Sequence, residues 1–227
     1  MKTTFQYGQQ HLTATIALSI AKGEIRGVLT EETREKVRAS ASAVEKIVAK
    51  GKPVYGINTG FGPLCTTMIS PDQTRKLQEN ILKSHAVGVG EPIPIDISKL
   101  MLILKIHALA KGYSGIQEAT LDRMIWHVEN NAIPVVPKQG SVGASGDLAP
   151  LAHLAIPLIG EGEVWYKAQK ISTQELYQQL GWKPLTLQSK EGLALINGTQ
   201  FMSAYGVNCL LQAKRLLAWA DAVAAIA

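Results

Sequence analysis

The sequence predicts a mainly α-helical protein, and three observations lead to that prediction. Helix start and stop signals recur along the chain, and the segments between them repeat apolar residues at helical spacing. Strand signals are confined to one short region, which is enough for at most one small hairpin. From about Gly198, a long run of small and apolar residues continues to Ala227. We therefore expect a helical domain that leads into a long-helix bundle.

Five helices are predicted from their boundary residues. The first begins after Thr30 as N-cap, carries Glu31 and Glu32 in its first turn, and ends before Gly51. Its predicted buried stripe consists of Val37, Ala41, Val44, Ile47 and Val48. The other four are bounded by the same kinds of residue: Ser70 and Pro71 for the second, Ser98 and Gly112 for the third, Gln117 and Asn130 for the fourth, and Thr173, Glu175 and Gly181 for the fifth.

The predicted hairpin pairs residues 164–166 with Lys170 and Ile171, whereas residues 133–137 are broken by two prolines. No glycine, proline or polar stop follows the last stretch of this helical run, residues 221–227, which favours a chain cut inside a larger helical domain over a genuine terminal helix. We expect an amino-terminal domain over residues 1–197 and the truncated start of a central helical bundle over residues 198–227.

Composition excludes several classes of function. The chain has 227 residues, 46% of them hydrophobic and 18% charged, which is typical of a globular protein with a sparsely charged surface and hints at oligomerisation. The net charge is +5, but the basic residues alternate with acidic ones, so no nucleic-acid partner is expected. The opening residues form no signal peptide, and lysine, arginine and aspartate interrupt the apolar stretches. We expect a cytoplasmic protein without a membrane partner.

One loop is unusually rich in small residues: residues 140–150 read Gly-Ser-Val-Gly-Ala-Ser-Gly-Asp-Leu-Ala-Pro. Because Gly146 has no Cβ, its backbone nitrogen is able to fold back toward the carbonyl carbon of Ala144. Ring closure and loss of the Ser145 hydroxyl would leave a five-membered imidazolone with an exocyclic methylidene, which is an electrophile. Asp147 is predicted to cap the next helix, whose positive N-terminus would face the ring. The alternative interpretation is an ordinary small-residue loop.

Three further stretches contain candidate functional residues: Val-Tyr-Gly-Ile-Asn-Thr-Gly-Phe-Gly at 54–62, Ser-His-Ala-Val-Gly at 84–88, and Glu-Gly-Leu-Ala-Leu-Ile-Asn-Gly-Thr-Gln at 191–200. The residues alone leave their roles open. Tyr55 is by itself more typical of loop packing than of an activated base. His85 near the end of the second helix fits helix capping, packing or catalysis. Asn197 fits a helix N-cap as well as a ligand contact.

Two common types of cofactor site have no support in the sequence. The glycines of the Tyr55 loop lack the Gly-Lys-Ser/Thr ending of a phosphate-binding loop. The five histidines form no H-E-x-x-H pattern and no cluster with carboxylates at ligand spacing. We therefore expect neither a bound metal nor a nucleotide.

Together, the small-residue loop and the three stretches resemble the aromatic amino-acid ammonia-lyase and aminomutase family, with the motifs in the same order. The resemblance implies that Ala144, Ser145 and Gly146 form the cofactor 4-methylideneimidazole-5-one (MIO) autocatalytically. It assigns supporting positions in the two loops to Gly60, Gly143 and Asp147. The fold it implies combines this cofactor loop, at a helix N-terminus, with the helical domain predicted above.

The resemblance also implies roles for single residues. Tyr55 would remove the β-proton of the substrate, and His85 and Asn197 would bind substrate or cofactor. The Ser-His-Ala around His85 is similar to the histidine-specific members, which implies elimination of ammonia from L-histidine to give trans-urocanate, the first step of histidine degradation. The alternatives are a tyrosine or phenylalanine ammonia-lyase or aminomutase, or a catalytically silent fragment with an unmodified Ser145. Family sites are shared between subunits, so the full-length protein is expected to be a homotetramer.

Overall fold

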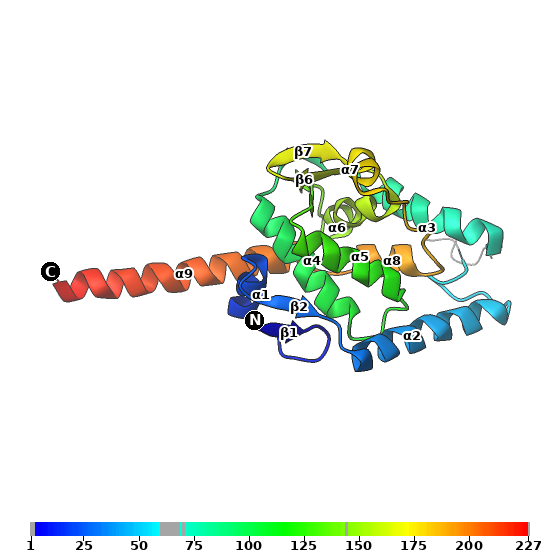
Figure 1. Cartoon of the computed structure of the whole chain (residues 1–227), viewed down its shortest axis with the longest axis horizontal. Coiled ribbons are helices and arrows are strands. Elements are labelled where there is room, and N and C mark those ends of the chain that lie inside the picture. The colour runs from blue at the N-terminus through cyan, green and yellow to red at the C-terminus, as the bar shows by residue number, and fades with distance from the viewer. Residues whose placement is uncertain (1–2, 60–68, 70, 144, 227) are drawn as a thin grey trace.

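The computed structural model describes residues 3–59, 69, 71–143 and 145–226. The described part is mainly helical, as predicted (Figure 1). Its helices are α1 (Ala14–Ala21), α2 (Glu31–Ala49), α3 (Pro71–His85), α4 (Ile95–Leu109), α5 (Glu118–Glu129), α6 (Leu148–Ala155), a 3-10 turn (Ile156–Ile159), α7 (Thr173–Leu180), α8 (Glu191–Ile196) and α9 (Gln200–Ile226). Its strands are β1 (Thr4–Gln6), β2 (Arg26–Val28), β3 (Val89–Pro92), β4 (Ile133–Pro134), β5 (Pro137–Gln139), β6 (Glu163–Tyr166) and β7 (Gln169–Ser172).

Helix α4 lies at the centre of the core, where it packs against α1, α5 and α9. Leu100, Met101 and Ile103 are among its fully buried residues. The prediction that Ser98 caps this helix is wrong, since the helix begins at Ile95 with Pro94 at the cap position. Ser98 is instead buried, and its Oγ donates a hydrogen bond of 2.6 Å to the carbonyl of Pro134. A serine whose side chain is buried in the core needs such an internal acceptor.

The other predicted helices are present, with small differences at their ends. Thr30 caps α2 by accepting a hydrogen bond from the backbone of Thr33, as predicted, but Ile47 and Val48 of the predicted stripe are only half-buried. Helix α3 begins at Pro71, whereas its predicted cap, residue 70, lies outside the described residues. Helix α7 is capped by Ser172, one residue before the predicted boundary. Helices α1 and α8 were not predicted.

The prediction of at most one small hairpin is wrong. The predicted hairpin exists as β6 and β7, with Val164 opposite Ile171. Strand β4 adds a third strand to it by pairing with β6, β1 pairs with β2 in parallel, and β3 pairs with β5 in antiparallel orientation. The prolines that argued against strands at residues 133–137 are tolerated, because β4 and β5 each pair with only one strand and leave their other edges free of ladder bonds.

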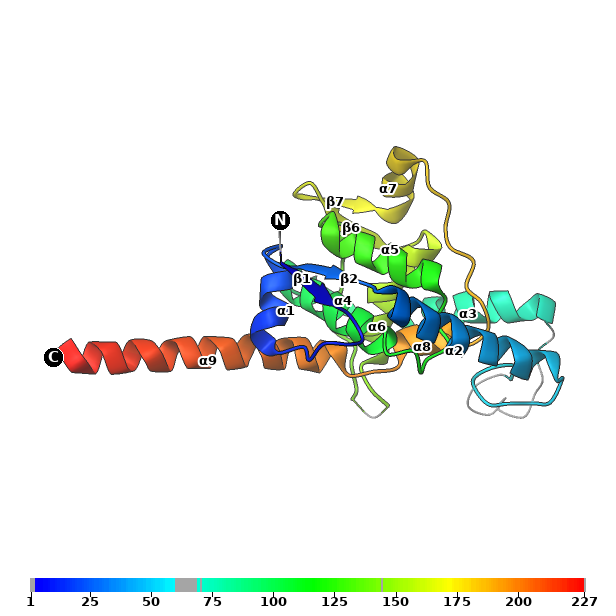
Figure 2. The same cartoon turned by 60° about the horizontal axis from the view of Figure 1, so that its bottom comes forward.

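Helix α9 projects far beyond the rest of the protein, and both views show its last turns away from every other element (Figures 1 and 2). Its first turns pack against α1, α4 and α6, and Ala204 is its one fully buried position among the described residues. Helix α8 and the turn at residues 197–199 precede it. The start of α9 therefore lies beside the core, close to the segment that follows the small-residue loop.

Candidate active site

The small-residue loop makes a tight reversal in front of α6. An antiparallel bridge pairs Gly143 with Gly146, so the chain turns back between them, and Ser145 is exposed. Gly143 and Gly146 have φ angles of +70° and +103°, a region that residues with a Cβ rarely adopt. Residue 144 lies outside the described residues, as does Gly60 of the Tyr55 loop.

Gly146 lies directly against the turn between α8 and α9. A Cβ at this position would be 2.4 Å from the carbonyl oxygen of Gly198. The same oxygen accepts a hydrogen bond of 2.8 Å from the backbone nitrogen of Asp147. The loop is thus docked onto the backbone of Gly198, and a glycine at position 146 is what permits this approach.

Asp147 occupies the predicted cap position before α6, but its carboxylate has another use. One oxygen accepts a hydrogen bond of 2.8 Å from Ser141 Oγ, and the other accepts one of 3.0 Å from the backbone nitrogen of Met202, in the first turn of α9. Asp147 is only 1% exposed. The prediction that its side chain caps α6 is therefore corrected: the carboxylate caps α9 and ties that helix to the small-residue loop.

His85 is the last residue of α3, as predicted, and its ring is held in one orientation. Its Nδ1 lies 2.9 Å from the carbonyl oxygen of Ile81 and 3.1 Å from Ser84 Oγ. Because a carbonyl oxygen only accepts hydrogen bonds, Nδ1 carries the proton, and Nε2 is the acceptor nitrogen of the neutral ring. The backbone of α3 thus sets the tautomer of His85.

Asn197 ends α8 and is exposed. The interpretation of this residue as a helix N-cap is wrong, since it stands at the C-cap of α8, and its Nδ2 donates to the carbonyl of Leu193 at 3.0 Å. Its own backbone carbonyl accepts a hydrogen bond of 2.6 Å from Nζ of Lys105 on α4. Lys105 is buried, and this burial lowers its pKa to about 7.

A cavity of about 450 Å³ brings the candidate residues together from four separate segments of the chain. Tyr55, His85, Ser145 and Asn197 all line it. Its walls are otherwise largely apolar, with Ile81, Leu148, Leu193, Ala194 and Ile196 as lining residues. The tyrosine is 62% exposed and lies at the rim. Leu148 is the first residue of α6, so the positive end of that helix lies beside Ser145, as predicted.

Three polar lining residues, Tyr113, Ser114 and Lys190, had not been predicted. Nζ of Lys190 donates a hydrogen bond of 2.6 Å to the carbonyl of Ser114, and burial lowers the pKa of this lysine. Tyr113 is 86% exposed at the rim. The sequence offers one weak signal, since Lys190 directly precedes the motif that contains Asn197. Nothing local points to residues 113 and 114, which lie in a loop before α5.

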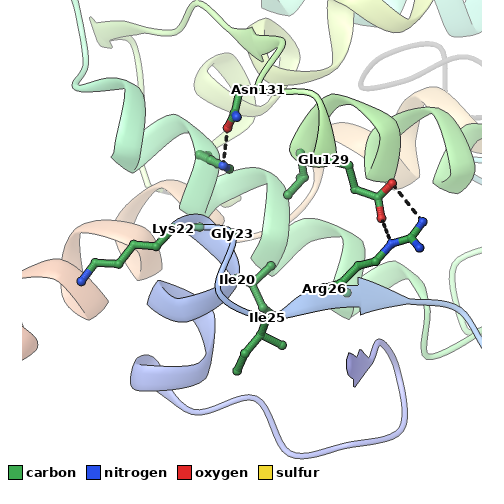
Figure 3. A pocket seen from close by; sticks show the side chains of 11 residues that line it. Ile20, Lys22, Gly23, Ile25, Arg26, Glu129 and Asn131 are labelled. Atoms are coloured by element: carbon green, nitrogen blue, oxygen red, sulfur yellow. Dashed lines mark hydrogen bonds and ion pairs between the residues drawn. The ribbon is translucent and has the colours of Figure 1, made fainter. Parts of the chain in front are cut away.

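A second cavity, of about 430 Å³, lies between the end of α1, β2 and the end of α5, with Lys99 of α4 in its lining (Figure 3). Three of its charged groups are engaged with protein partners: Arg26 forms a bidentate ion pair with Glu129, and Lys99 donates a hydrogen bond to the Asn131 side chain. It contains none of the predicted site residues, so the candidate active site is the cavity that contains Ser145.

The described residues lack two further features. No group of three or more histidine, cysteine, aspartate or glutamate side chains is arranged to hold a metal ion there. None of the described helices is both long and apolar enough to cross a membrane.

The fold and the cavity define a class of protein. Residues 12–227 match the aromatic amino acid lyase family, and the chain belongs to that family. Within it, the chain is similar to proteins named histidine ammonia-lyase: it is 48% identical to that of Symbiobacterium thermophilum over 95% of this chain and 43% of the relative.

Solved structures agree with this assignment. Histidine ammonia-lyase from Trypanosoma cruzi superposes with a TM-score of 0.85 and 34% identity, over 94% of this chain and 41% of that one. Tyrosine aminomutase from Streptomyces globisporus gives a TM-score of 0.84 and 32% identity, over 90% and 38% of the two chains. The chain thus spans about two fifths of the length of these relatives, in their amino-terminal part.

Proposed function

We propose that this chain forms part of the active site of an ammonia-lyase that converts L-histidine into trans-urocanate and ammonia. The observation that carries the proposal is the shared cavity of Tyr55, His85, Ser145 and Asn197, which are separated by up to 142 positions in the sequence. Identity of 41–48% to histidine ammonia-lyases supports histidine as the substrate.

The cofactor would form from Ala144, Ser145 and Gly146. The backbone nitrogen of Gly146 attacks the carbonyl carbon of Ala144, one water leaves from this adduct, and a second leaves as the Ser145 hydroxyl with a hydrogen of its α-carbon. The described part of this loop fits that chemistry, because Gly146 takes a positive φ and Ser145 is exposed to the cavity. The resulting MIO group would supply an electrophile that no ordinary side chain provides, beside the positive N-terminus of α6.

The residues of the cavity would bind histidine and move one proton. Nε2 of His85, as the acceptor of a neutral ring, would accept an N–H hydrogen bond from the substrate imidazole. The Asn197 amide donates to Leu193 through Nδ2, which leaves its Oδ1 for the substrate amino group. The Tyr55 oxygen, as phenolate, would take the β-proton; the electron pair of that C–H bond forms the double bond, and the amino group leaves with its bonding pair.

A tyrosine- or phenylalanine-specific lyase or aminomutase is the main alternative. The fold does not discriminate between them, because the tyrosine aminomutase structure is as similar in shape as the histidine ammonia-lyase structure. His85 favours histidine, since its Nε2 is an acceptor suited to an imidazole N–H. The further alternative is a fragment without activity of its own, in which Ser145 remains unmodified.

Replacement of Ser145 tests the proposal. Three amino acids, L-histidine, L-tyrosine and L-phenylalanine, should be offered side by side to the protein and to Ser145→Ala, with Val142→Ala as the control. Val142 belongs to the same loop and is 85% exposed. We expect conversion of histidine alone, loss of the near-ultraviolet absorbance of the ring and of activity in Ser145→Ala, and no change in Val142→Ala. Unchanged turnover in Ser145→Ala would refute the proposal, and preference for another amino acid would support the alternative.

The remaining predictions concern the whole protein. We propose that residues 1–197 form an amino-terminal domain and that residues 198–227 begin a central helical bundle. The apolar residues exposed along α9 support this division, since they include Leu216, Leu217 and Trp219. A homotetramer and a cytoplasmic location remain predictions.

A further inference from the structure

A buried lysine stands behind the candidate site and takes no part in the chemistry proposed above. Lys105 lies on α4 and is 2% exposed. Its neighbours on this helix, Leu102, Ile103 and Ile106, are apolar and buried. No ion pair of the described residues involves Lys105, and burial alone lowers its pKa to about 7. An ammonium group is costly at such a position, where an apolar side chain of the same length would pack equally well.

One hydrogen bond between described residues explains the position of Lys105. Its Nζ donates at 2.6 Å to the backbone carbonyl of Asn197, the residue whose side chain lines the cavity. The next carbonyl along the chain, that of Gly198, accepts from the backbone of Asp147 and touches Gly146. Two successive carbonyls of one turn are therefore held by different parts of the fold: the Asn197 carbonyl by a core lysine, and the Gly198 carbonyl by the small-residue loop.

We propose that Lys105 is a positioning residue, which fixes the Asn197–Gly198 turn so that the small-residue loop docks in the conformation that cyclises. The inference rests on the proposed function, because cyclisation is part of it. The lysine acts through the turn, because its hydrogen bond goes to the Asn197 carbonyl and it is not among the residues that line the cavity. Its hydrogen bond to Asn197 also sets where the side chain of that residue lies in the cavity.

The chain offers a matched control. Lys99 lies on the same helix and is 7% exposed, and its Nζ hydrogen-bonds to Asn131 at the second cavity, away from the loop. Lys99→Met and Lys105→Met both replace a buried ammonium with an apolar side chain of similar length. Lys105→Met loses the hydrogen bond to the Asn197–Gly198 turn, whereas Lys99→Met loses a hydrogen bond to Asn131 and leaves that turn untouched. Lys105→Arg keeps a hydrogen-bond donor at the tested position.

The experiment uses the protein in the form that is assayed for conversion of L-histidine. Intact mass gives the cyclised fraction as the loss of two waters, steady-state kinetics give kcat and KM, and circular dichroism gives the helix content. We expect Lys105→Met to keep its helix content and to lose about tenfold in kcat per chain, with a matching fall in the cyclised fraction. Lys105→Arg should recover much of both, and Lys99→Met should change neither.

Equal cyclisation and kcat in Lys105→Met and the unaltered protein would overturn the inference, as would an equal loss in Lys99→Met. If Lys105→Met fails to fold, a folded Lys105→Arg that does not cyclise overturns it. A failure of the proposed function would give a different experimental result from a failure of this inference. A protein that cyclises in a Lys105-dependent manner but does not convert histidine would refute histidine as the substrate and leave the inference standing.

Discussion

Gly143 and Gly146 lie on the two sides of the same turn, yet a methyl group would have very different effects at the two positions. Both residues have a positive φ, so alanine would be strained at either. Around Gly143 there is nothing within 4 Å of an added Cβ, whereas at Gly146 the Cβ would meet the Gly198 carbonyl at 2.4 Å. Only the second position has a backbone neighbour that would have to move.

Gly146→Ala should therefore undock the loop, and Gly143→Ala should not. We expect Gly143→Ala to cost about 1 kcal/mol of unfolding free energy from backbone strain alone. Gly146→Ala should cost about 1–3 kcal/mol more, because the Asp147–Gly198 hydrogen bond breaks as the loop moves. Urea unfolding measures both values, and intact mass shows whether cyclisation is lost. Equal effects of the two substitutions would contradict the docking described above.

His127 on α5 is a buried histidine outside the candidate site, and its role is structural. It is 1% exposed, its Nδ1 donates to the carbonyl of Ala132 at 2.6 Å, and its Nε2 has no partner among the described residues. Burial lowers its pKa from 6.5 to about 4, with a smaller contribution from the charge of Arg123. The neutral ring is therefore the form that the folded protein accommodates.

The pH dependence follows from this difference between folded and unfolded states. Between pH 6.5 and 4 the unfolded chain binds a proton at His127 and the folded protein does not, so stability falls as the pH falls through this window. We expect a loss of about 3 kcal/mol by pH 4, measured by urea unfolding at a series of pH values. In His127→Phe, this part of the pH dependence should disappear. An unchanged slope in that variant would show that other groups cause it.

At the scale of elements, Asp147 connects parts of the fold that sequence signals treat separately. A residue of this type before a helix predicts an N-cap, and α6 does begin immediately after it. The tertiary structure instead directs the carboxylate to the backbone of Met202 in α9, and Ser141 holds its other oxygen. The reason is that the first turn of α9 also has unpaired N–H groups, and the loop carries Asp147 to them.

Asp147→Ala should destabilise the protein by about 1–3 kcal/mol, since it removes both hydrogen bonds and leaves the Met202 nitrogen without its acceptor. Ser141→Ala removes only one of these bonds and should cost about 1 kcal/mol or less. Hydrogen exchange at the first turn of α9 should rise in Asp147→Ala and stay low in Ser141→Ala. Faster exchange in α6 rather than in α9 of Asp147→Ala would instead support the sequence-based prediction that Asp147 caps α6.

At the scale of the whole molecule, α9 leaves the core after its first turns and exposes a series of large apolar side chains. Leu216, Leu217, Trp219 and Val223 are each more than 60% exposed. Such a concentration of exposed apolar surface marks an interaction site in a folded protein. It accounts for the long hydrophobic run that the sequence shows after Gly198.

The 227-residue chain is therefore expected to self-associate through α9. Light scattering should give a mass above the 24.5 kDa of one chain. Leu217→Glu combined with Trp219→Glu should reduce this association, because it places charges on the apolar surface. Gln212→Glu combined with Ala220→Glu adds the same charge at exposed positions of the same helix and should reduce it less. A monomer at all concentrations in the unaltered chain would contradict the expectation.

The sequence by itself determined the helical class, most helix ends and the four motifs, because capping, periodicity and short motifs depend on neighbours along the chain. Ser98 and Ser172 show where local signals fail. Ser98 was predicted to cap α4 but bonds to the carbonyl of Pro134, whereas Ser172 caps α7 one residue before the predicted boundary. Either serine is able to cap a helix or to bond elsewhere, and the packing around it decides which it does. The tertiary structure alone decided which candidate residues share one cavity, namely Tyr55, His85, Ser145 and Asn197. It also decided that Lys190 lines the same cavity and that Lys105 hydrogen-bonds to Asn197. These contacts span tens of residues, and they form only when the core around α4 brings distant segments together.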